Sequence, residues 1–261
     1  MPPTQADMAS TNTRQPVPER LVVLTFDDGV KSQYTVVAPL LQRYGFGATF
    51  YITEGLRFLE DKSRYLTWAE VRVLHDLGFE IGNHTRQHKN VATQTPAELR
   101  ADLLHIDQRC AEQGIPRPTT FCYPGYHTSP AAVQVIADHG FHFARTGSLP
   151  DYPVHREGGR GPAYDPARHH PLLVPTTGAA GPNWGFADLV WAVEQATAGR
   201  IAVLTFHGVP DLDHPWVHTE PALFATYLHY LHEAGCTVIA MRDLARYVDP
   251  TNATKLSSRV G

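Results

Sequence analysis

Two adjacent carboxylates follow an apolar run near the start of the chain, in the sequence LVVLTFDDG at residues 21–29. Asp27 and Asp28 repel each other when both are ionised, and like charges this close raise the pKa of at least one of them. Asp-Gly is a common turn dipeptide, so a plain turn is one explanation. A shared metal ion or proton is the other. The remaining acids and imidazoles of the chain decide between the two.

Two histidines stand four residues apart in the sequence NHTRQH, as His84 and His88. They lie on the same face, and reach one ion, if this loop makes a single helical turn. With fifteen histidines in the chain such pairs also arise by chance. An aspartate from a neighbouring strand end completes a His₂Asp set, which leaves a zinc-type ion an open position for water or substrate. The pattern therefore favours a catalytic metal site over a closed structural one.

Strands and helices alternate along the chain, and these elements must position the polar residues. Helix starts are marked by T-x-x-E capping boxes at Thr67 and Thr95 and by Pro96 and Pro130 at first helical positions. The alternation predicts one domain with parallel strands, either an α/β barrel or a doubly wound sheet. The eight predicted strands are 21–25, 48–52, 78–82, 119–123, 141–145, 172–176, 201–206 and 236–240.

The polar candidates all follow predicted strands, where the sites of parallel α/β folds are built. Five loops are therefore expected to converge on one rim. The candidates are Asp27 and Asp28 after the first strand, His84 and His88 after the third, residues 123–126 after the fourth, Arg145 at the end of the fifth and His207 after the seventh.

These motifs, in this order, resemble a known family. TFDDG, then H-T-x-x-H, then a Tyr-Pro motif and a late Leu-x-x-His are similar to the polysaccharide deacetylases of the NodB-homology type, carbohydrate esterase family 4. The resemblance covers residues 20 to about 245 and implies a single distorted (β/α) barrel of seven or eight strands.

The resemblance also implies roles for individual residues. Asp28, His84 and His88 would bind a divalent metal ion, and Asp27 would be the general base. The cation would neutralise Asp28 and leave Asp27 ionised, which accounts for the adjacent pair. His207 would be the general acid, and the backbone N–H of Gly125 would stabilise the oxyanion. Zinc suits this ligand set best, although cobalt, nickel or iron would accept the same geometry.

The third motif departs from the family pattern, which reads R-x-P-Y. Here the stretch is Cys122-Tyr123-Pro124-Gly125-Tyr126, so the arginine that holds the catalytic aspartate is missing. Arg145, from the adjacent strand end, could orient Asp27 in its place, or it could face solvent. Cys122 is expected to be a packed strand residue, because no activating base adjoins it in sequence. The Asp-Trp of the fourth motif is also absent, which predicts an altered substrate pocket.

Aromatic residues and one long loop are candidates for the substrate site. Tyr126, Trp184 and Trp216 could stack on a flat sugar face, although aromatic residues are more often core. Residues 147–185 are rich in glycine and proline and lack a clear helix, so they are expected to form a lid or wall, with surface decoration as the alternative. His214 and His218, after His207, could line another wall.

Composition excludes several classes of protein. Of the 261 residues 43% are hydrophobic and 18% charged, which is typical of a globular protein. The net charge of −4, without a basic cluster, argues against nucleic acid or anionic membranes as partners. Three scattered cysteines suggest neither a disulfide framework nor a cysteine zinc site. We expect a flexible leader over 1–19, the barrel over 20–249 and a tail over 250–261.

Location and oligomeric state are less constrained. The first residues lack the apolar core of a secretory signal, and no run is long enough to span a membrane. A cytoplasmic protein is therefore expected, while the sequence leaves its oligomeric state open.

Three functions remain open at this point. The first is metal-dependent hydrolysis of a C–N amide bond, with removal of an acetyl group from an N-acetylated amino sugar or polysaccharide. The second is hydrolysis of a small cyclic amide or ureide on the same barrel, which the missing sugar-site motifs and the absent export signal favour. The third is a barrel that binds carbohydrate without turning it over, supported only by the lost arginine.

Overall fold

Nine strands form one sheet in the residues that the computed structural model describes, which are 14–147 and 159–251. The order across the sheet is β5-β4-β3-β2-β1-β8-β7-β6, and β9 also pairs with β1. The strands are β1 (Leu21–Phe26), β2 (Thr49–Ile52), β3 (Glu80–Asn83), β4 (Thr120–Cys122), β5 (Phe143–Arg145), β6 (Gly159–Arg160), β7 (Gly178–Ala179), β8 (Ala202–Phe206) and β9 (Thr237–Ile239).

The strand β1 is the centre of the sheet and pairs in parallel with three neighbours. Along one edge its first half pairs with β9, in the register Val22 to Val238, and its end pairs with β2. Along the other edge it pairs with β8 over five residues. All pairs between strands are parallel except β6 with β7, as expected for strands joined by helical crossovers.

The sheet curls into a barrel, and the segment 174–179 connects its two sides. Val174 forms a parallel bridge with Arg145 at the end of β5, and Gly178 pairs with Leu204 of β8. The predicted (β/α) barrel is thus confirmed. The predicted strand over 172–176 is reduced to this one bridge, because Pro175 has no N–H to donate to a ladder. The two-residue strands β6 and β7 were not predicted.

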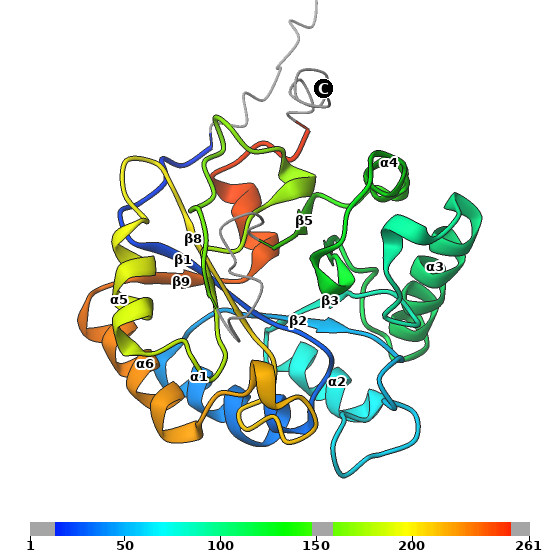
Figure 1. The fold of residues 1–261 in the computed structure, drawn as a ribbon, viewed down its shortest axis with the longest axis horizontal. Coiled ribbons are helices and arrows are strands. Elements are labelled where there is room, and N and C mark those ends of the chain that lie inside the picture. Colours follow the sequence, from blue (N-terminus) through cyan, green and yellow to red (C-terminus); the bar gives the residue numbers. More distant parts are fainter. Residues whose placement is uncertain (1–13, 148–158, 252–261) are drawn as a thin grey trace, which may run out of the picture.

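Six α-helices of the described residues lie around the outside of the strands (Figure 1). They are α1 (Ala38–Tyr44), α2 (Trp68–Asp76), α3 (Pro96–Glu112), α4 (Pro130–His139), α5 (Phe186–Glu194) and α6 (Pro221–Glu233). Both predicted capping boxes are present, because the side chains of Thr67 and Thr95 accept from the N–H groups of Glu70 and Glu98, whose side chains reach back. Gly45 and Gly140 end α1 and α4 in the left-handed conformation, which glycine adopts without steric cost.

Successive side chains along β1 point to opposite faces of the sheet, and this alternation sets the direction of Asp27. Val22, Leu24 and Phe26 pack in the core between the strands and the helices, and Phe26 stacks on Phe50 at 5.2 Å between ring centroids. Leu21 and Val23 belong to a separate cluster inside the barrel. The same alternation carries Asp27 to the interior side of the barrel mouth. Burial of a large apolar side chain such as Phe26 contributes about 1.5–3 kcal/mol.

The termini of the described chain are tied to the barrel. Within the predicted leader, the N–H of Gln15 donates to the carbonyl of Arg246 at 2.9 Å, and Val17 packs on the interior cluster. Arg14 forms an ion pair with Asp249. Residues 14–19 are therefore part of the domain, while residues 1–13 and 252–261 of the predicted leader and tail lie outside the described residues.

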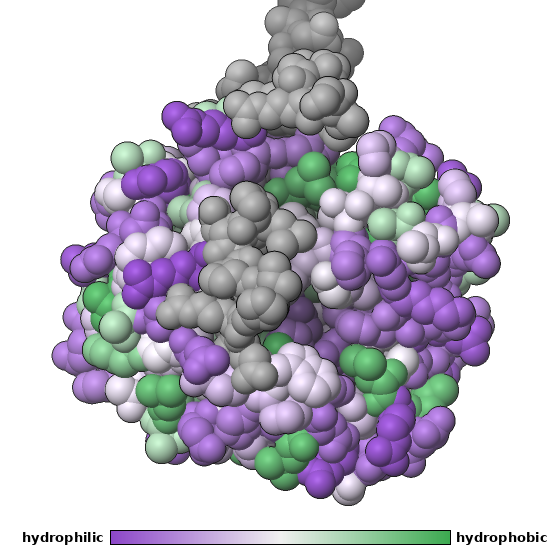
Figure 2. All heavy atoms as spheres, viewed as in Figure 1, coloured by the Kyte–Doolittle hydropathy of each residue, from purple (hydrophilic) through white to green (hydrophobic). Residues whose placement is uncertain are grey.

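The face of the molecule that Figure 2 shows is largely hydrophilic, with apolar residues in small separate groups. None of the described helices combines the length and the apolarity that crossing a bilayer requires.

Candidate active site

Four of the five predicted loops converge on one cavity of about 290 Å³ at the carboxyl ends of the strands, whereas Arg145 at the end of β5 is not part of its lining. This active cavity opens among both aspartates, three predicted histidines and the third motif. Its described lining is Asp27, Asp28, Leu56, His84, His88, Tyr123, Gly125, Tyr126, His207, His214, Trp216 and Val217.

Three side chains form a compact group with metal-ligand chemistry, namely Asp28, His84 and His88. One ligand atom from each lies within 4.8 Å of the others. His84 Nε2 is 3.4 Å and His88 Nε2 3.2 Å from Asp28 Oδ1, a buried oxygen that accepts no well-formed hydrogen bond. Burial alone would raise the pKa of Asp28, but the facing imidazoles of His84 and His88 bring it well below its usual range. The group therefore fits a divalent cation.

A backbone contact fixes the orientation of the His84 ring. Its Nδ1 lies 2.8 Å from the carbonyl oxygen of Cys122, which can only accept, so Nδ1 carries the proton. The lone pair of Nε2 then points toward Asp28, as required of a metal-binding imidazole.

The loop between the two histidines is not helical, contrary to the single helical turn that the spacing predicted. Thr85 and His88 have left-handed backbones, with φ of +63° and +55°, and Asp28 has φ of +73°. The spacing thus brings His84 and His88 together through a strained loop instead. For a β-branched residue such as Thr85 this conformation is an outlier, and strain of this kind costs about 1–3 kcal/mol per residue.

Arg145 contacts Asp27 inside the barrel, which is one of the two alternatives that the sequence left open, and it does not face solvent. Its Nη2 donates to Asp27 Oδ2, and both side chains are buried. Burial alone would raise the pKa of Asp27, but the Arg145 guanidinium together with the nearby His84 and His207 imidazoles lowers it. Arg145 does not line the active cavity. Its position at the end of β5 places it beneath Asp27 instead.

Cys122 lies between these two charged residues. Arg145 Nη2 is 2.8 Å and Asp27 Oδ2 3.6 Å from its sulfur. Burial raises the pKa of the Cys122 thiol well above its usual value. It is therefore a packed strand residue with no thiolate character, in agreement with the prediction.

His207 extends from the end of β8 toward both aspartates. Its Nε2 lies 3.9 Å from Asp27 Oδ2 and 3.8 Å from Asp28 Oδ2, while its Nδ1 is buried without a hydrogen bond in the described chain. The Gln33 side chain donates to the backbone carbonyls of Asp27 and His207 and so links β1 to β8 beneath the cavity.

The third motif forms one wall of the active cavity. Gly125 and Tyr126 adopt left-handed backbones, with φ of +58° and +62°, which turns the chain across the mouth. The Tyr126 ring lies over the Arg145 guanidinium, 5.5 Å from ring centroid to Cζ, and rests on Gly147. Both predicted residues thus reach the cavity.

Trp184 does not reach the active cavity, and its predicted contact with substrate is wrong. Its side chain is 2% exposed and packs edge-on against Phe206 and Tyr227 in the core around α5 and α6. Gly178 allows this packing, because a Cβ there would come within 2.7 Å of the indole. Trp216 is the tryptophan at the cavity, where it is 52% exposed.

The predicted wall after β8 is present, and it includes a residue pair that the sequence did not reveal. His214 lines the cavity, and its Nδ1 lies 3.4 Å from the buried carboxylate of Asp211. That carboxylate also accepts the N–H groups of Asp213 and His214. Hydrogen bonding to Asp211 raises the pKa of His214. The spacing Asp-x-x-His was the available signal. His218 instead contacts Glu220 and the backbone of Asp211, and it does not line the cavity.

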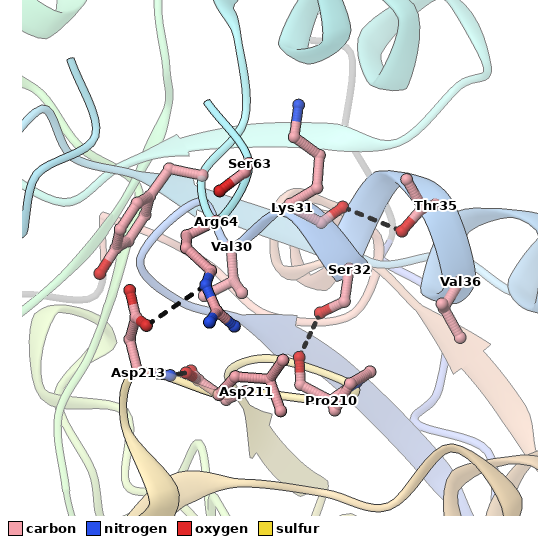
Figure 3. A pocket seen from close by; sticks show the side chains of 12 residues that line it. Val30, Lys31, Ser32, Thr35, Val36, Ser63, Arg64, Pro210, Asp211 and Asp213 are labelled. Carbon is pink, nitrogen blue, oxygen red and sulfur yellow. Dashed lines mark hydrogen bonds and ion pairs between the residues drawn. The ribbon is translucent and has the colours of Figure 1, made fainter. Parts of the chain in front are cut away.

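A second, smaller hollow of about 190 Å³ borders this wall (Figure 3). Its polar groups are paired with one another, since Arg64 reaches Asp213 at 3.6 Å and Ser32 donates to the Pro210 carbonyl at 2.9 Å. Ser32 also accepts the N–H of Val209. These contacts around the hollow therefore stabilise the loop that carries His214.

The glycine-rich stretch 147–185 does not line the active cavity in its described part. Residues 159–185 contribute β6, β7 and the segment 174–179 that connects the sides of the barrel. The predicted lid or wall over 148–158 lies outside the described residues.

Glu54 supports the loop that carries His84 and His88 from one side. Its carboxylate accepts from Trp68 Nε1 at 2.8 Å, His105 Nε2 at 2.6 Å and Arg109 Nε at 2.9 Å, and its N–H donates to the carbonyl of Arg86. Burial would raise the pKa of Glu54, but these hydrogen bonds lower it below 4.5. No motif along the chain marks this residue.

Glu54→Gln is expected to lower the free energy of unfolding by about 1–3 kcal/mol at neutral pH, because three donors lose a charged acceptor. The unfolded chain holds the Glu54 proton more tightly, so its contribution is present above the usual pKa of 4.5 and disappears as the pH falls. Urea unfolding at pH 7 and at about pH 3 checks this. The difference from wild type should shrink at the lower pH, and an unchanged difference would contradict the assignment.

Comparison with known proteins gives related sequences and folds. The family described as polysaccharide deacetylase matches residues 14–144. The peptidoglycan-N-acetylglucosamine deacetylase of Bacillus cereus is 30% identical over 124 residues, which are 47% of this chain and 54% of that protein. The chain therefore spans about half the length of this curated relative.

Two solved structures show the same fold at low sequence identity. PdaA of Bacillus subtilis, a family 4 carbohydrate esterase, is 17% identical with a TM-score of 0.59, over 89% of this chain and 83% of that one. BA3943 of Bacillus anthracis, described as a pseudoenzyme of the same family, is 16% identical with a TM-score of 0.58, over 88% and 67%. At these identities the likeness shows the fold alone.

Proposed function

Because the chain belongs to the polysaccharide deacetylase family, we propose that it is a metal-dependent hydrolase that removes the acetyl group from an N-acetylated amino sugar. One observation carries the proposal. The group Asp28, His84 and His88 lies in the active cavity directly beside a second, buried carboxylate, Asp27, that is not part of it. A binding protein has no need for a base and a metal group placed together.

Asp27 is the proposed general base. Its Oδ2 is occupied by Arg145, whereas its Oδ1 is buried without a hydrogen-bond partner in the described chain. The guanidinium keeps the carboxylate ionised, so Oδ1 is the atom that takes a proton from the attacking water.

His207 and Gly125 act on the other groups of the reaction. As the C–N bond breaks, His207 Nε2 donates a proton to the departing amine, while the water oxygen remains on the acetyl carbon and acetate leaves. The Gly125 N–H, at the wall of the same cavity, stabilises the oxyanion of the tetrahedral intermediate.

A divalent ion bound by Asp28, His84 and His88 would supply positive charge beside the acetyl carbonyl and would lower the pKa of water. Zinc suits a His₂Asp set, and cobalt, nickel or iron would suit the same residues.

The amino-sugar substrate is supported by the relative from Bacillus cereus, whose name gives peptidoglycan N-acetylglucosamine as its substrate. The aromatic groups Tyr126 and Trp216 lie at the cavity and offer flat faces to a sugar ring.

A second candidate function is the hydrolysis of a small cyclic amide or ureide. The cavity of about 290 Å³ favours it, because that volume is at the lower end for ligand sites and suits one ring better than a polymer.

Metal content and product analysis test these functions together. The purified chain is stripped with a chelator, reloaded with zinc and incubated with N-acetylated chitooligosaccharides or with small cyclic amides. We expect about one ion per chain and acetate release from the oligosaccharides that depends on it. Ammonia or ring opening, without acetate, would support the second function. A chain that binds no ion, or binds one and turns over neither class of substrate, would overturn the hydrolase proposal. His229→Ala, on the exposed face of α6, is the matched control for loss of an imidazole.

A further inference from the structure

The strained loop Thr85–His88 is held by hydrogen bonds to side chains at the start of the loop. The side-chain oxygen of Asn83 accepts the N–H of Thr85 at 3.0 Å, and the hydroxyl of Thr85 accepts the N–H of His88 at 3.1 Å. Asn83 is fully buried. These two contacts fix the left-handed residues that separate His84 from His88.

The loop is also fitted closely against the strand end beside it. The carbonyl of Arg86 accepts from the N–H of Glu54 at 3.0 Å and from the hydroxyl of Thr53 at 3.2 Å. A Cβ at Gly55 would lie 2.8 Å from the carbonyl group of Gln87. The loop therefore has little room to relax on this side.

Asn83 in turn is held from outside the barrel by α3 and α4. Its amide donates to the carbonyl of Leu103 at 3.0 Å and to Asp107 Oδ1 at 3.2 Å, both on α3. The other oxygen of Asp107 accepts from His139 Nε2, at the end of α4, at 2.8 Å. Because a carboxylate only accepts, Asp107 fixes the direction of the Asn83 amide, and with it which atom faces Thr85.

We propose that Asn83, Asp107 and His139 form a positioning network that holds His84 and His88 in their metal-binding arrangement. None of the three residues lines the active cavity. The inference rests on the proposed metal binding at Asp28, His84 and His88. The network lowers the cost of the strained backbone in the metal-free protein, so the ion meets a site that is already formed.

The test measures metal affinity and stability separately on the full chain. Zinc affinity is obtained by competition with a chromogenic chelator, and the cobalt-loaded protein reports ligand geometry through its visible absorption spectrum. Asn83→Ala and Asp107→Ala are expected to weaken zinc binding by about 10–100-fold. Asp107→Asn keeps an acceptor for Asn83 but loses the charge, so it should fall between wild type and Asp107→Ala. Urea unfolding of the metal-free variants gives their stability.

A second measurement examines the loop without metal. Amide hydrogen exchange at residues 84–90 of the metal-free protein should be faster in Asp107→Ala than in wild type. Asp138→Ala is the matched control, because this exposed carboxylate on α4 contacts Arg100 and Gln134 and lies outside the network. It should leave zinc affinity and exchange at wild-type values.

Two outcomes would overturn the inference, and they are distinguishable. If wild type binds zinc and the Asn83 and Asp107 variants bind it equally well, with only their stability reduced, the network has a purely structural role. If wild type itself binds no zinc, the proposed function fails and this inference fails with it. Asp107→Asn, the mildest of the changes, keeps the test decisive if Asn83→Ala does not fold.

Discussion

Asp27→Asn is expected to lower kcat for acetyl removal by about 10²–10⁴-fold, while zinc binds with wild-type affinity. Asparagine has nearly the same shape as aspartate and its oxygen still accepts from Arg145, but its side chain takes no proton from water. Asp27 is not one of the proposed ligands Asp28, His84 and His88. It also lies close to His84 and Cys122, but its Oδ2 accepts from Arg145 and burial raises the pKa of the Cys122 thiol well above its usual value, so this second group suits an ion less well. Activity should therefore fall without loss of metal, which steady-state kinetics and metal analysis of the same preparation would measure.

Asp28→Asn is the informative comparison for this prediction. Its Oδ1 faces both His84 and His88, so the loss of its charge should weaken metal binding as well as turnover. If Asp27→Asn retained full activity, Asp27 would not be the base. If it lost metal as Asp28→Asn does, Asp27 would belong to the ligand set.

Arg145→Ala is expected to reduce the free energy of unfolding of the metal-free protein by about 3–5 kcal/mol, since it leaves the Asp27 carboxylate buried without its cation. Arg145 also donates to Thr176 and contacts Cys122, and the substitution removes both of these contacts as well. Urea unfolding followed by circular dichroism would measure the change.

The same variant should shift the pH dependence of activity. Arg145 lowers the pKa of Asp27 against the effect of burial, so its removal should raise that pKa. The acid limb of the kcat/KM profile, where Asp27 becomes protonated, should move to higher pH. The free energy of unfolding depends on pH in the same direction. Because the folded protein lowers the pKa of Asp27, this residue contributes stability above its usual pKa of 3.8, and that contribution is lost as the pH falls. An acid limb unchanged in Arg145→Ala would show that Arg145 does not act through Asp27.

Arg145→Lys separates charge from geometry in this prediction. Lysine keeps a positive charge but lacks the planar group that reaches Asp27, Cys122 and Thr176 together. We expect it to restore part of the stability and to leave the acid limb between those of wild type and Arg145→Ala.

The helix starts and strands that depend on local chemistry were the features that the sequence predicted best. Thr67 and Thr95 start helices because their hydroxyls cap backbone N–H groups nearby, and the structure has both boxes. The β-branched runs 21–25 and 201–206 form strands because their alternating side chains pack on both faces of the sheet. The run 172–176 failed because Pro175 cannot pair, and β7 escaped notice because Gly178 and Ala179 have low strand propensity and pair only through tertiary context.

Site residues were predictable as types but not in their full surroundings. The order of the strands brings Asp27, His84 and His207 together, so motif order was sufficient for them. Trp184 was misplaced because an aromatic residue beside glycines suits a core as well as a binding site. Asp107, on an outer helix, contacts Asn83 24 residues earlier. No pattern along the chain marks such a contact.

Arg145 connects two parts of the molecule that are usually considered apart. Its Nη1 donates to Thr176, which follows the bridge residue Val174 on the segment that joins β5 to β8, and its Nη2 donates to Asp27. The Arg145 guanidinium thus holds the two joined sides of the barrel together and keeps Asp27, the proposed base, deprotonated. A fluctuation that separates the two sides of the barrel would also break the contact between Arg145 and Asp27. The proposed base would then lose its activity whenever the barrel wall opens.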